Sequence, residues 1–180
     1  MAGAMSDESP WPQTVRWTEA KAGPLRLDLV ADTQTLERVA GALDLPALKN
    51  LRADLTVRAW LDGLEIGGRI TAVATRVCGV SLELFDEPID EPLSVRVVPD
   101  GSPHAPSGEG GEVIVDPEAE DPPDVLLGDT IDVGAYVVEH LALSLDPFPR
   151  KPGAVFETPD IGAPASPFAV LARLKTPREN

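Results

Sequence analysis

The chain has 180 residues, of which 43% are hydrophobic and 4% aromatic, and its net charge is −15. This length predicts one domain with appendages, and no apolar run approaches the roughly twenty residues that a membrane helix requires, so no membrane-spanning helix is expected. Acidic residues are concentrated: between Arg76 and Arg150 there are one basic residue, Arg96, and seventeen acids, a net charge of −16. Because such a field repels phosphate, this half predicts a Lys/Arg-rich protein partner rather than a nucleic acid.

The N-terminal half predicts strands and one helix. Residues 1–12 are polar and acidic, lack the features of a signal peptide, and are predicted to be disordered. Alternation of apolar and polar residues predicts short strands at 14–18 and 25–30. Asp32 is then a suitable N-cap for a helix that starts at Thr33 and ends before Pro46.

A β-hairpin is the clearest predicted element. Residues 55–61 and 66–75 alternate in polarity on either side of Asp62-Gly63, a dipeptide typical of tight type I′ turns. Gly67-Gly68 inside the second strand predicts a bulge or sharp bend. Further strands are expected at 80–84 and 93–98, with residues 86–92 as their connection.

The C-terminal half alternates between irregular and ordered stretches. Residues 100–124 are rich in Gly, Pro, Ser and acids and predict a mobile loop with an apolar island at 113–115. A strand at 125–127 and a helix capped by Asp132 and running to Leu145 follow. Residues 147–180 predict a Pro-rich tail ending in a short helix whose N-cap and first residue are Ser166-Pro167.

These elements predict an α+β fold in a single domain over 13–146. Short adjacent strands with brief turns favour a curved, largely antiparallel sheet of about six strands, covered by the two main helices. A split barrel is the alternative, because a Gly-rich bend favours closure.

Three blocks, at 67–83, 129–147 and 166–175, together resemble the YceD family, the large ribosomal RNA subunit accumulation domain. The string Pro149-Arg150-Lys151-Pro152-Gly153 is similar to its alphaproteobacterial branch. The resemblance implies a cytoplasmic bacterial protein that is needed for accumulation of large-subunit (23S) ribosomal RNA, with no known catalytic activity and no cofactor. The residues that match its motifs are Cys78, Asp132, Glu139, Leu143, Pro147, Pro167 and Phe168.

The chain departs from this family at one motif. Many members carry Cys-x-x-Cys, whereas this chain has Cys78 and Ser81. A structural zinc site needs four N or S ligands, so we expect no metal site within the chain. A lone cysteine also excludes an internal disulfide and favours the cytoplasm.

Signals for catalysis are absent. Cys78 could act as a nucleophile and His140 as a catalytic base. For both residues the sequence favours the alternative, an ordinary packed side chain without a catalytic role. No nucleotide-binding loop and no Gly-x-Ser-x-Gly elbow occurs, so we expect no enzyme.

Partner contacts are the remaining candidates. The carboxylates at 116–124 could bind a divalent cation, but their spacing matches no EF-hand loop. The favoured interpretation is a solvated acidic run that attracts basic proteins. Trp60 is expected opposite the apolar face of its strand, and the C-terminal helix either docks on a partner or folds back. The predicted partner-binding residues are Trp60, Glu118, Glu120, Asp121, Asp124, Phe168, Leu171 and Leu174.

Three hypotheses for function follow. The first is a non-enzymatic ribosome biogenesis factor that acts through a basic partner, such as a ribosomal protein or an rRNA-processing factor. The second is a direct RNA binder, and the third a thiol enzyme or metalloprotein that uses Cys78. The RNA binder requires one contiguous basic patch formed from Arg16, Arg26, Arg38, Lys49, Arg52, Arg58, Arg69, Arg150, Lys151, Arg173 and Lys175.

Overall fold

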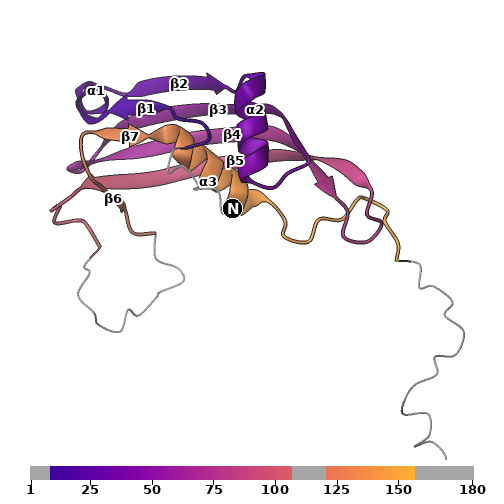
Figure 1. Ribbon diagram of the computed structural model, residues 1–180. Coiled ribbons are helices and arrows are strands. Elements are labelled where there is room, and N and C mark those ends of the chain that lie inside the picture. Colours follow the sequence, from indigo (N-terminus) through magenta and orange to yellow (C-terminus); the bar gives the residue numbers. More distant parts are fainter. Residues whose placement is uncertain (1–8, 107–120, 157–180) are drawn as a thin grey trace, which may run out of the picture.

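The computed structural model describes residues 9–106 and 121–156 and shows an α+β fold (Figure 1). A five-stranded sheet has the order β2-β3-β4-β5-β6, and a two-stranded sheet pairs β1 with β7. The predicted fold class is confirmed, since every pairing except β5–β6 is antiparallel. The larger sheet is open, with β2 and β6 at its edges, so the split barrel is not confirmed. The elements are β1 (Thr14–Arg16), α1 (Trp17–Ala22), β2 (Leu25–Val30), α2 (Thr33–Ala42), β3 (Ala47–Trp60), β4 (Gly63–Val77), β5 (Leu84–Pro99), β6 (Asp124–Leu126), β7 (Thr130–Asp132) and α3 (Val133–Ser144).

The predicted hairpin is present as β3–β4, but its turn lies one residue earlier than expected. Trp60 pairs with Gly63, so the two turn residues are Leu61 and Asp62, and Leu61 takes a positive φ of 50°. Gly63 is needed for a different reason. A Cβ on it would lie 2.2 Å from the carbonyl oxygen of Val97, so only glycine allows β5 this close.

The bulge predicted at Gly67-Gly68 is wrong. The pairing of β3 with β4 is regular there, and the irregularity lies between Lys49 and Arg52. Gly68 has a packing role instead, because a Cβ on it would lie 2.1 Å from the backbone oxygen of Asp54. The glycine therefore allows close approach of two backbones, which is the other common reason for glycine in a strand.

Strand β5 is longer than the sequence predicted. The separate strand expected at 80–84 is wrong, because residues 78–83 form a turn, and the connection expected at 86–92 belongs to β5. Pro88 and Pro92 are tolerated because they are four residues apart, so their ring nitrogens point to the same side. That side is the free edge of the sheet, since β6 pairs only with Val97–Pro99.

The two main helices begin where predicted. Asp32 caps α2 by accepting a hydrogen bond from the Thr35 amide at 2.8 Å. Asp132 caps α3 through the amides of Gly134 and Ala135, and it also accepts from the Gln13 amide at 2.8 Å. The N-terminal strand ends earlier than expected, at Arg16, where α1 begins. The strand β7 that pairs with it was not predicted.

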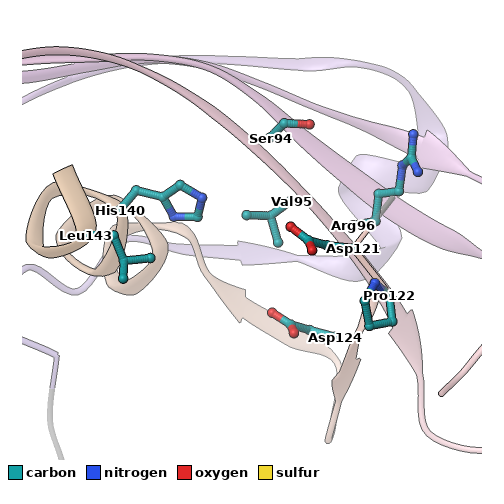
Figure 2. Close-up of a pocket in the computed structure, with 8 residues that line it drawn as sticks. All are labelled: Ser94, Val95, Arg96, Asp121, Pro122, Asp124, His140 and Leu143. Atoms are coloured by element: carbon teal, nitrogen blue, oxygen red, sulfur yellow. The ribbon is translucent and has the colours of Figure 1, made fainter. Parts of the chain in front are cut away.

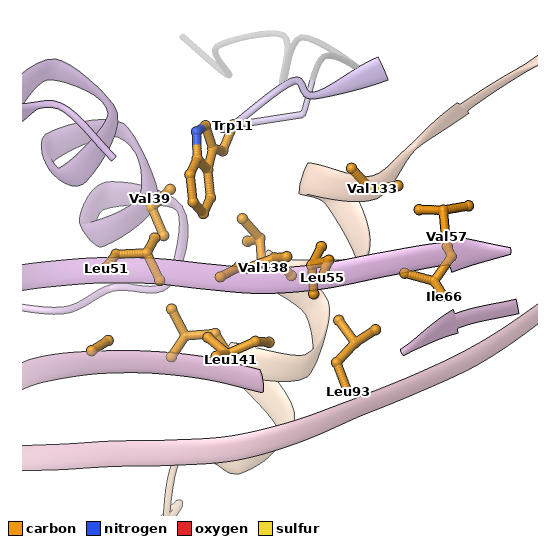
Figure 3. Packing of buried hydrophobic residues seen from close by; sticks show 14 of the residues in the cluster. Trp11, Val39, Leu51, Leu55, Val57, Ile66, Leu93, Val133, Val138 and Leu141 are labelled. Carbon is orange, nitrogen blue, oxygen red and sulfur yellow. The ribbon is translucent and has the colours of Figure 1, made fainter. Parts of the chain in front are cut away.

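Helices α2 and α3 and the β1–β7 ribbon cover one face of the larger sheet, and the opposite face is open (Figure 1). Leu51, Leu55, Ile66 and Leu141 belong to the core between the layers (Figure 3). Trp11 is also in this core and is only 4% exposed, so the predicted disorder does not extend through residues 9–12. Asp124, placed in the predicted loop, instead begins β6. The apolar island and the C-terminal helix lie outside the described residues.

Candidate functional site

The open face of the larger sheet collects charged side chains, because alternate residues of each strand point away from the core. We call this the outer face. It carries one more basic than acidic residue, whereas the whole chain has a net charge of −15. Its basic residues are Arg26, Lys49, Arg52, Arg58, Arg69 and Arg96, and its acidic residues are Asp28, Asp54, Glu65, Asp86 and Asp90.

Five of the six bases on the outer face form ion pairs with acids of the same face. Lys49 contacts Asp86 at 2.8 Å and lowers the pKa of that carboxyl, with help from the Thr75 hydroxyl. The other pairs are Arg52–Asp28, Arg58–Glu65, Arg69–Asp90 and Arg96–Glu65. The pairs of Lys49, Arg52 and Arg69 are exposed on both sides, and exposed pairs each stabilise a fold by only about 0–1 kcal/mol. Their effect is to balance the field, so the outer face is not a strongly basic surface.

Trp60 lies at one end of the outer face, as predicted from its strand position. The guanidinium carbon of Arg96 is 4.9 Å from the centroid of the Trp60 ring, and Arg96 Nε is 3.8 Å from Glu65 Oε1. A cation over an indole face is a favourable arrangement. The contacts of Arg96 therefore hold its charged group on the outer-face side of β5.

A cavity of about 400 Å³ opens beside Arg96, where β5, the approach to β6 and α3 meet (Figure 2). Two carboxylates, a histidine and an exposed leucine contribute to its wall. We call it the edge cavity, and its lining residues are Ser94, Val95, Arg96, Asp121, Pro122, Asp124, His140 and Leu143. Of the predicted partner-binding residues, the structure thus places Asp121 and Asp124 together, and Arg96 connects them to Trp60.

Helix α3 orients two groups around the edge cavity. His140 Nδ1 is 3.0 Å from the carbonyl oxygen of Tyr136, which can only accept, so Nδ1 carries the proton. Burial, followed by the hydrogen bond to Asp124, raises the pKa of Tyr136. The phenol therefore remains protonated next to the Asp124 carboxylate, which lines the cavity.

Several residues of this cavity were not identified as part of a partner site from the sequence. His140 was considered only as a catalytic base, and Leu143 only as a family-motif residue. The parallel pairing of β6 with Val97–Pro99 brings residues 121–124 to β5, and no sequence signal indicated it. The one available hint was that Arg96 is the single base in a long acidic stretch.

Cys78 lies in the turn after β4 and is fully buried. The amides of Val80 and Ser81 each donate to its Sγ at 3.4 Å. The Ser81 hydroxyl contributes most, followed by the amides of Ser81 and Lys151, and together they lower the pKa of Cys78 to about 6 against the opposing effect of burial. A buried sulfur is a poor nucleophile toward external substrates, which favours the packing role. Among the described residues, no group of three His, Cys, Asp or Glu side chains is arranged to hold a metal ion.

The Cys78 turn should make a pH-dependent contribution to stability. Because the folded-state pKa is below that of an unfolded thiol, about 8.5, the contribution is complete above pH 8.5 and is lost as the pH falls through 6. We therefore expect the difference in unfolding free energy between wild type and Cys78→Ala to be larger at pH 9 than at pH 5.5. Urea denaturation at both pH values measures it, and an equal difference would contradict the assigned thiolate.

The remaining predicted residues are dispersed or undescribed. Glu139 is exposed on α3, and Pro147 follows that helix and lines a second cavity with Arg76. The undescribed ones are Glu118, Glu120, Pro167, Phe168, Leu171 and Leu174. No helix within 9–106 or 121–156 is long and apolar enough to cross a bilayer.

Fold and site together define an α+β protein with a charge-balanced open sheet and an acidic cavity at one sheet edge. A family model described as "Large ribosomal RNA subunit accumulation protein YceD" matches residues 66–175, which is more than half of the chain. The chain therefore belongs to the YceD family, whose name connects it with accumulation of large-subunit ribosomal RNA and which is not a known enzyme family. No curated protein and no solved structure matches the chain.

Proposed function

We propose that this chain acts in the cytoplasm as a non-enzymatic ribosome biogenesis factor. It supports large-subunit ribosomal RNA accumulation by binding a basic protein, such as a ribosomal protein or an rRNA-processing factor. The observation that carries the proposal is the edge cavity, where Asp121 and Asp124 of the −16 segment converge on the sheet edge. An anionic surface raises the association rate with basic partners and suppresses binding of acidic ones.

The proposal predicts salt-dependent capture of basic proteins. An affinity-tagged chain, crosslinked in cells that express it natively, should recover proteins of high isoelectric point. Recovery should fall about tenfold between 50 mM and 500 mM salt, because screening weakens exposed charge pairs. Mass spectrometry identifies the proteins. Acidic partners, or recovery that does not respond to salt, would contradict the proposal.

Direct RNA binding is the second candidate, because five of the bases proposed for a basic patch lie on the outer face, which also carries Trp60 at one end. These are Arg26, Lys49, Arg52, Arg58 and Arg69. It is disfavoured because this face has almost no net charge, and phosphate would have to displace the paired carboxylates. Crosslinks from protein-free ribosomal RNA to the outer face at physiological salt would favour direct RNA binding over binding of a basic protein.

A further inference from the structure

The edge cavity presents hydrogen-bond acceptors at a place where a single cationic side chain can enter. Asp121 and Asp124 supply carboxylate oxygens, and His140, whose Nδ1 proton is engaged by Tyr136, leaves Nε2 as an acceptor in its neutral form. Figure 2 shows the imidazole extending from α3 toward Val95, on the same side as the Asp121 carboxylate. We propose that the edge cavity binds an arginine side chain of the basic partner, an inference that rests on the proposed function.

The chemistry of the wall favours a guanidinium over other ligands. A guanidinium has five N–H donors and no acceptor, which complements two carboxylates and an imidazole nitrogen. Val95, Pro122 and Leu143 add apolar surface for the methylene groups of the same side chain, and Leu143 is 76% exposed. An anionic ligand would instead meet two carboxylates.

Arg96 lines the cavity without filling it. Its guanidinium stacks on Trp60 and faces Glu65 on the outer face, and Figure 2 shows it directed away from His140. With one base and two acids in its wall, the edge cavity keeps a net charge of −1. The proposed arginine would therefore meet the two carboxylates from the α3 side of the cavity.

The test uses N-acetyl-arginine methylamide as the probe, titrated into the ¹⁵N-labelled full chain and followed by NMR. We expect saturable shifts of the amides of Ser94, Arg96, Asp124 and His140. The citrulline analogue, which has nearly the same shape without charge, should produce none. The double variant Asp121→Asn/Asp124→Asn should weaken binding about fivefold, as expected for two exposed charge pairs.

A matched control separates the cavity from the general acidic field. Asp100→Asn/Asp129→Asn removes the same two charges at exposed positions outside the cavity, and it should leave the affinity within a factor of two. Equal weakening by both variants, binding of citrulline, or shifts that map elsewhere would overturn the proposal. If crosslinking recovers basic partners while arginine fails to bind, this inference fails and the proposed function stands. If arginine binds but only acidic partners are recovered, the proposed function fails instead.

Discussion

Replacing Gly134 by alanine should destabilise the fold by about 2–3 kcal/mol, although alanine is the better helix former. Gly134 lies in the first turn of α3, and a Cβ on it would be 1.8 Å from the backbone oxygen of Trp11. A backbone atom cannot rotate aside, so the segment carrying the buried Trp11 would have to move. Denaturant unfolding of both proteins measures the loss.

The matched control for this substitution is Gly41→Ala in α2. A Cβ at Gly41 meets no atom within 4 Å, so helix propensity alone should act, and it should stabilise by about 0.5–1 kcal/mol. Opposite signs for the same substitution in two helices would establish the Trp11 contact. If Gly134→Ala were neutral or stabilising, that contact would not constrain α3, which carries the His140 side chain of the edge cavity.

The sequence predicted correctly those features of the fold that depend only on residues close together in the chain. Asp32 and Asp132 were correct caps because capping depends on residues three or fewer positions away. The interpretation of Gly67-Gly68 as a bulge failed because the constraint on Gly68 comes from Asp54 on the neighbouring strand. Residues 86–92 were predicted as a connection, and their place in β5 was missed because the position of their prolines at a free edge depends on which strand comes next in space.

The candidate site was predictable only in part for the same reason. The acidic charge follows from composition, and the position of Trp60 on the outer face follows from strand alternation. The cavity requires β6 to pair in parallel with the end of β5, and this brings residues 121–124 next to α3. Parallel pairing joins segments that are distant in sequence, so no pattern within either segment indicates it.

Arg76→Met should destabilise the fold by about 2–3 kcal/mol and loosen the segment after α3. The Arg76 side chain is only 10% exposed, and its Nη1 is 3.2 Å from Glu87 Oε2 while Nη2 donates to the Asp146 carbonyl at 2.5 Å. Methionine fills similar space but leaves a partly buried carboxylate and a carbonyl without their cation. Urea denaturation measures the loss. Amide exchange of Gly79, which donates to Pro149 O, should accelerate because Arg76 helps hold that segment.

Arg69→Met is the control, because Arg69 also lies on β4 and pairs with an acid of β5. Its side chain and that of Asp90 are 58% and 64% exposed, so water already solvates both charges and the loss should stay below about 1 kcal/mol. The contrast isolates burial as the cause, since both variants remove one arginine from the same strand. Equal losses for the two variants would show that the contact between Arg76 and Asp146 contributes nothing, and the end of α3 would then be held to the sheet by its apolar residues alone.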